Sequence, residues 1–110
     1  MNKKIKFCYG GVNYTLEYDR KAIEIMEANG LEIDAIKSKP ASTISILWQG
    51  AFLKNHKKEK SEKIQEIYDN MGNKSELNAY LSEMAVETYT SLLGDDEDRD
   101  NSKNIDWKMS

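Results

Sequence analysis

Residues 4–18 read KIKFCYGGVNYTLEY, and the alternation in this stretch decides the fold. Apolar and polar residues alternate on both sides of Gly10-Gly11, which is the pattern of two half-buried strands joined by a two-residue turn. Folding the chain at the glycines pairs Ile5 with Leu16, Phe7 with Tyr14 and Tyr9 with Val12 on an apolar face, and Lys4 with Glu17, Lys6 with Thr15 and Cys8 with Asn13 on a polar face. A slip of one residue would mix the two faces, so the sequence predicts a single hairpin register.

Four amphipathic stretches follow the hairpin and predict helices at about residues 20–29, 41–56, 62–71 and 75–93. The signals for helix starts are the N-cap residues Asp19 and Ser61, Pro40 in a first turn, and the capping-box pair Asn73 and Glu76. We therefore predict an α+β fold with one domain over residues 1–94. In this domain a two-stranded antiparallel β-hairpin precedes a bundle of about four helices.

The second predicted helix is more apolar than one buried face requires. Its main stripe consists of Ile44, Leu47, Trp48, Ala51 and Phe52, and Ile46 and Leu53 widen it. The simplest interpretation of large aromatic residues on a helix is the core. In so small a protein, however, the surplus of apolar surface indicates that another subunit or a partner covers part of the helix. The predicted protein-interaction residues are Leu47, Trp48, Ala51 and Phe52.

Gly50 lies inside the same stripe, although glycine is about 1 kcal/mol less favourable than alanine within a helix. In many proteins a glycine stays inside a helix, despite this loss of stability, because a neighbouring group packs too close for a side chain. We therefore predict that another backbone approaches the helix closely at Gly50.

The composition changes sharply after Gly94. Residues 95–104 read DDEDRDNSKN and contain no apolar side chain, so this segment cannot offset the entropy lost on ordering. The sequence predicts an acidic flexible tail over residues 95–110. Ile105 and Trp107 are apolar residues beyond this polar tether, and we predict that they dock onto another protein.

Residues that could perform chemistry are few and isolated. The chain has one cysteine, Cys8, and one histidine, His56. Cys8 lacks a second cysteine for a metal or redox motif, and His56 is expected to act as a cation near a helix C-terminus. The carboxylates are interleaved with lysines on polar helix faces, and no phosphate-binding glycine loop occurs. We therefore predict no enzymatic activity, no cofactor and no metal site.

The charge pattern argues against nucleic acid and membrane as partners. The net charge is −3, and no stretch approaches the ~20 apolar residues that cross a bilayer. The N-terminus lacks the apolar run of a signal peptide, so a cytoplasmic location is expected. The basic cluster Lys54, Lys57, Lys58, Lys60 and Lys63 leaves three interpretations open. The first is a solvated helix end, which is favoured over the second, contact with nucleic acid or an acidic partner. In the third interpretation, the acidic tail folds back over these lysines.

Several segments resemble a known family when taken together: KFCYGGVNYTLEYDRKAIEIMEANG at 6–30, ISILWQGAFLKNHKK at 44–58, EKIQEIYDNM at 62–71, DDEDRD at 95–100 and NIDW at 104–107. Through these segments, nearly the whole chain resembles the tail assembly chaperones. This family consists of small proteins encoded in the tail-gene region of long-tailed phages and prophages of Gram-positive bacteria. The resemblance carries no catalytic signature and assigns no role to individual residues.

The resemblance implies a role in building the phage tail. Such proteins bind the tape measure protein, cover its apolar helical segments and are displaced as tail tube subunits polymerise around it. They act in the host cytoplasm and are absent from the mature virion. The expected partners are the tape measure protein, the tail tube protein and a second copy of the chain. Two alternatives remain open: an acidic phage protein that inhibits a host nucleic-acid-binding enzyme by mimicry, and a minor virion structural protein.

Overall fold

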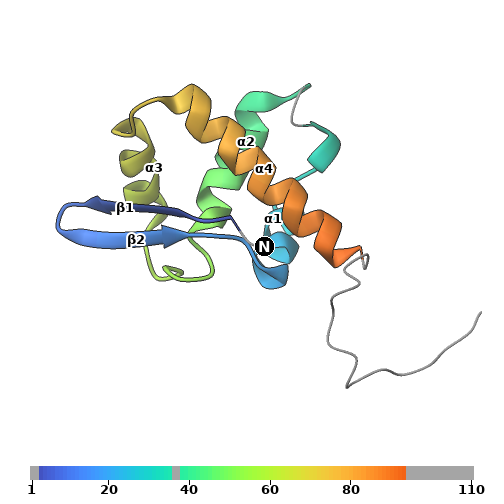
Figure 1. Cartoon of the computed structure of the whole chain (residues 1–110), viewed down its shortest axis with the longest axis horizontal. Coiled ribbons are helices and arrows are strands. Elements are labelled where there is room, and N and C mark those ends of the chain that lie inside the picture. Colours follow the sequence, from blue (N-terminus) through green and yellow to red (C-terminus); the bar gives the residue numbers. More distant parts are fainter. Residues whose placement is uncertain (1–2, 36–37, 94–110) are drawn as a thin grey trace, which may run out of the picture.

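The computed structural model describes residues 3–35 and 38–93 (Figure 1). Its elements are β1 (Ile5–Tyr9), β2 (Val12–Leu16), α1 (Arg20–Ala28), a 3-10 helix (Ile33–Ala35), α2 (Pro40–Ala51), α3 (Ser61–Asp69) and α4 (Lys74–Leu92). The predicted α+β class, with an antiparallel hairpin followed by four helices, is confirmed. The predicted acidic tail over residues 95–110, with the docking residues Ile105 and Trp107, lies outside the described residues.

The hairpin has the register that the sequence predicts. β1 and β2 pair antiparallel, with Ile5 opposite Leu16 and Tyr9 opposite Val12. Gly10 and Gly11 have φ angles of 58° and 80°, and a type I′ turn needs such positive values at both central positions. The two glycines therefore fix the turn, and the alternating pattern then fixes which face of the hairpin meets the helices.

Two of the predicted helix starts have the expected caps. The Asp19 carboxylate accepts a hydrogen bond from the Ala22 N–H at 2.8 Å. The Asn73 side chain accepts from the Glu76 N–H and donates from Nδ2 to Glu76 Oε1 at 2.8 Å. The start of α3 differs from the prediction. Ser61 is its first helical residue, and the N-cap is Lys60, whose side chain makes no capping hydrogen bond.

The α2 helix ends at Ala51, five residues before the predicted end. The Ala51 carbonyl accepts a hydrogen bond from the Glu17 N–H at 3.3 Å, so the chain after β2 takes up one of the helix's final carbonyl groups. Beyond this point the chain turns, and Asn55 and His56 reach the backbone of β2. Tertiary contacts with the hairpin therefore replace the last predicted turn of helix.

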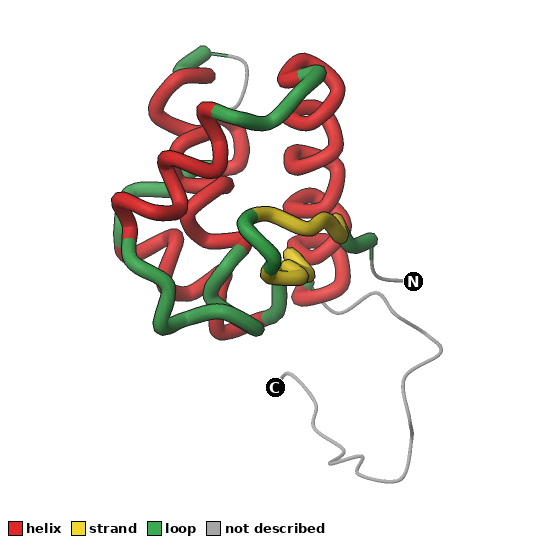
Figure 2. Tube along the Cα trace, turned by 90° about the vertical axis from the view of Figure 1, so that its left-hand side faces the viewer, coloured by secondary structure: helices red, strands yellow, loops and turns green. Residues whose placement is uncertain are grey.

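The α2 helix is the centre of the molecule and contacts α1, α3 and α4. Figure 2 shows the long α4 on one side and the shorter helices on the other, with the hairpin between them. The core takes side chains from both strands' inner face and from all four helices. Its largest fully buried members are Trp48, Phe52, Leu16, Met26, Leu47, Ile67, Leu81 and Met84.

Candidate functional site

The predicted interaction residues of α2 lie in the core. Leu47 and Ala51 are 0% exposed, and Trp48 and Phe52 are 1% exposed. The Trp48 indole N–H donates to the Ile64 carbonyl at 2.8 Å, and its ring meets aromatic rings from the hairpin, from α3 and from Phe52, which caps α2. The prediction that these four side chains meet a partner is corrected, because the chain's own hairpin and helices cover them.

A surface that could meet a partner lies beside them, between α1, α2 and α3. It is an open groove of about 630 Å³ with three half-buried aliphatic side chains, Ile25, Ile46 and Leu53. Its polar rim includes Asn29, Gln49, Lys57, Glu59, Glu62 and Gln65. We call this surface the helical groove. Ile46 and Leu53 are the two residues that widen the apolar stripe of the second helix. The helix therefore has apolar surface outside the core, but at these two positions and not at the four predicted ones.

The connection between α2 and α3 covers the free edge of β2 at Thr15. The Thr15 N–H donates to Nε2 of His56 at 3.0 Å, and Nδ2 of Asn55 donates to the Thr15 carbonyl at 3.1 Å. The His56 ring also packs on Tyr14, with 4.9 Å between ring centroids. The expectation that His56 acts as a cation at a helix C-terminus is therefore wrong. Nε2 is a hydrogen-bond acceptor in this structure, and α2 ends before this residue.

Glu17 is a buried carboxylate, with only 5% of the residue exposed. It accepts a hydrogen bond from Asn55 Nδ2 at 2.9 Å and lies 3.2 Å from Lys54 Nζ and 3.9 Å from Lys4 Nζ. The Asn55 hydrogen bond, assisted by the two lysines, lowers the pKa of Glu17 below its ordinary value, although burial opposes the shift. The carboxylate therefore stays ionised and ties the end of the hairpin to the chain after α2.

The lowered pKa of Glu17 predicts a stability that depends on pH. A carboxylate with a lower pKa in the folded than in the unfolded state stabilises the protein above the unfolded pKa, 4.5, and loses this contribution as the pH falls through the folded pKa. Urea unfolding between pH 7 and pH 3 should therefore show a steeper loss of stability for the wild type than for Glu17→Gln. Glu24→Gln, at an exposed carboxylate on α1, is the control and should keep the wild-type slope. If Glu17→Gln and the wild type lost stability with equal slopes, the lowered pKa of Glu17 would be contradicted.

Three tyrosine hydroxyls are bound to carboxylates and stay protonated. Tyr14 donates to Glu59 at 2.7 Å, and this hydrogen bond raises its pKa to about 12. Burial and a hydrogen bond to Glu27 raise the pKa of Tyr89 to about 12, and a hydrogen bond to Glu66 raises the pKa of Tyr9. At neutral pH these side chains therefore hold carboxylates in place and do not act as bases.

Residues 3–35 and 38–93 contain no group of three His, Cys, Asp or Glu side chains that could hold a metal ion. Within the same ranges, no helix combines the length and apolar character needed to cross a membrane. In the predicted basic cluster, Lys54 pairs with Glu17, and Lys63 lies 3.6 Å from Glu66 and over the Tyr9 ring. These two lysines contact side chains of the hairpin and α3, which favours a structural role over a nucleic-acid surface.

The comparisons with known proteins point to a family without an assigned activity. No curated protein and no solved structure matches the chain. A family model described as a domain of unknown function, DUF5055, matches residues 1–110. Since this match covers the whole sequence, the chain belongs to the DUF5055 family.

Proposed function

We propose that the protein is a tail assembly chaperone of a long-tailed phage or prophage. In this role it binds the tape measure protein in the host cytoplasm, keeps it soluble while tail tube subunits assemble, and is absent from the mature virion. It works by contact and not by catalysis. The resemblance over nearly the full sequence suggests the role, and the helical groove is the observation that supports it.

The helical groove has the chemistry of a binding site for an amphipathic helix. Ile25, Ile46 and Leu53 offer apolar contacts, and the rim offers side chains of both signs, among them Lys57 and Glu62. An amphipathic helix places apolar residues at i, i+3, i+4 and i+7 into such grooves while its polar face stays in water. The floor beneath the groove includes Met26 and Gly50, which are part of the packed core. The site is therefore held in shape before a partner arrives.

The test is co-expression with a tape measure protein. The double variant Ile46→Asp/Leu53→Asp places two charges in the groove and should weaken binding at least tenfold, about 1.4 kcal/mol, because desolvating an unpaired carboxylate is unfavourable. The tape measure protein should then move to the insoluble fraction. Val86→Asp is the matched control, since Val86 is 47% exposed on α4 and does not line the groove.

Thermal unfolding of all variants shows whether they fold, so that loss of binding is not confused with loss of structure. As a second measurement, a synthetic apolar helix of the tape measure protein should shift the NMR signals of Ile25, Ile46 and Leu53 in the wild-type protein. The proposal fails if the tape measure protein is equally soluble without the chain. If the groove variant folds and binds the tape measure protein as tightly as the wild type, the helical groove is not the binding site.

A further inference from the structure

The two edges of the hairpin differ in how their backbone groups are satisfied. In an antiparallel pair closed at Tyr9 and Val12, every second residue directs its N–H and C=O away from the partner strand. On β2 these residues are Asn13 and Thr15, and Asn55 and His56 bind both groups of Thr15. On β1 the corresponding residues are Lys6 and Cys8. Across the part of the chain that the structure describes, neither makes a backbone hydrogen bond on its outward side.

The apolar face is also open along β1. On β2, Tyr14 and Leu16 are 2% and 0% exposed, and only Val12, beside the turn, is open at 47%. On β1 the three inward residues, Ile5, Phe7 and Tyr9, are all half-buried. The β2 edge is thus covered at Thr15, whereas the β1 edge is open at both outward residues. An open edge can pair with a further strand, because unpaired edge groups readily bind another extended segment.

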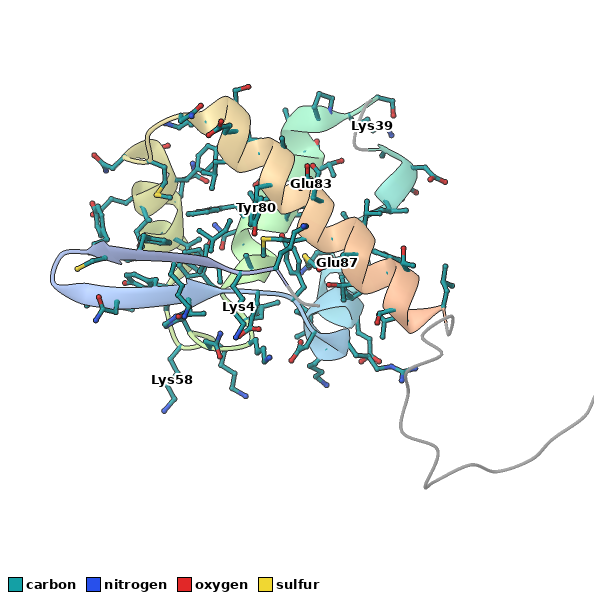
Figure 3. All side chains as sticks on the ribbon, in the orientation of Figure 1. Lys4, Lys39, Lys58, Tyr80, Glu83 and Glu87 are labelled. Atoms are coloured by element: carbon teal, nitrogen blue, oxygen red, sulfur yellow. The ribbon has the colours of Figure 1, made fainter. Side chains whose placement is uncertain are left out.

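A second groove runs beside the start of this open edge, where β1 approaches the first half of α4. It has a volume of about 490 Å³, and its apolar lining comes from Ile5, Leu77, Ala79 and Tyr80, with Glu76 and Glu83 on its rim. Figure 3 shows Tyr80 on the side of α4 that faces β1. We call this surface the strand groove. An extended segment in it would gain both backbone hydrogen bonds and apolar contacts.

We propose that residues 104–109 of the same chain occupy the strand groove and pair with β1 as a third strand. Their sequence, NIDWKM, alternates strictly between polar and apolar residues, which is the pattern of a half-buried strand. Ile105, Trp107 and Met109 would share the face of Ile5 and Phe7. Asp106 would lie on the outer face, where Lys4 and Lys6 carry the opposite charge.

The geometry of α4 brings this segment within reach. The Lys3 N–H donates to Glu87 Oε1 at 3.1 Å, so the start of β1 touches α4 five residues before its end at Leu92, about 8 Å along the helix axis. Residues 94–103 can span about 33 Å, and β1, with five residues, is about 17 Å long. The connection is therefore long enough to reach any part of the open edge.

Cys8 provides the test, because it is the single cysteine of the chain and is exposed on β1. A nitroxide label on Cys8 should broaden the NMR signal of the Trp107 indole N–H, and reduction of the nitroxide should restore it. In the unlabelled protein the amides of Lys6 and Cys8 should exchange slowly with solvent. Ile105→Pro/Asp106→Pro should abolish the broadening and speed exchange of both amides at least tenfold, since neither proline can donate to β1. The control Asn101→Pro/Ser102→Pro should change neither.

A mixing experiment separates this strand from one supplied by a second copy. Nitroxide-labelled protein without ¹⁵N is combined with ¹⁵N-labelled protein without nitroxide. If Trp107 broadens in this mixture, the strand comes from another molecule and the intramolecular assignment is overturned. Absence of broadening in the directly labelled protein, or amide exchange that the paired prolines leave unchanged, would overturn the third strand itself. Neither result bears on the helical groove, which involves different residues and a different partner.

Discussion

Replacing Trp48 by alanine is expected to lower the free energy of unfolding by about 3–5 kcal/mol, the usual cost of removing a large aromatic residue from a core. Such a change is a large part of the about 5–15 kcal/mol that stabilises a typical domain. The side chain is 1% exposed and lies between the hairpin and α3. Its removal would leave a cavity there and would remove the indole hydrogen bond to the Ile64 carbonyl, so both packing and hydrogen bonding contribute to the loss.

Urea unfolding followed by circular dichroism measures this effect. Trp48→Phe keeps most of the aromatic volume but loses the indole N–H, so it should cost less than the alanine variant. Val86→Ala is the control, because Val86 is 47% exposed on α4 and lines neither groove, and its truncation should cost less than about 1 kcal/mol. An alanine variant at position 48 as stable as the wild type would contradict the buried position and restore the prediction that Trp48 meets a partner.

The hairpin could be predicted from the sequence because two independent signals agree. The Gly10-Gly11 turn fixes where the chain reverses, and the alternation fixes which residues share a face, so the register of Ile5 with Leu16 follows from local information. The caps at Asp19 and Asn73 are likewise local, since donor and acceptor lie three residues apart. Features of this kind do not depend on how distant segments pack.

The candidate site could not be predicted in the same way. Helical periodicity shows that Leu47 and Trp48 are apolar positions, but it does not show whether the chain itself or a partner covers them. The chain's own core covers them, and the open positions are Ile46 and Leu53, at the margin of the stripe. His56 illustrates the same limit, because its hydrogen bond to Thr15 joins residues 41 positions apart in the sequence.

Gly50→Ala is expected to destabilise the protein by about 1–3 kcal/mol, although alanine is favoured over glycine in a helix by about 1 kcal/mol. A methyl group at this position would overlap Sδ and Cγ of Met26. Met26 is 0% exposed, and the overlapping atoms lie in the middle of its side chain, so the whole side chain would have to move. The close approach predicted at Gly50 therefore exists, but the approaching group is a side chain of α1 and not a backbone.

A double-mutant cycle tests this explanation. Met26→Ala alone should cost about 2–5 kcal/mol, because it leaves a cavity at the junction of α1 and α2. In that background Gly50→Ala should be neutral or stabilising, since its methyl group enters space that the methionine has vacated and only the helix preference remains. Ser42→Ala, at an exposed position of α2, should have the same small effect in both backgrounds. If Gly50→Ala were equally destabilising with and without Met26, the overlap could not be its cause. The sign change between the two backgrounds therefore separates a steric reason for Gly50 from a requirement of the helix backbone.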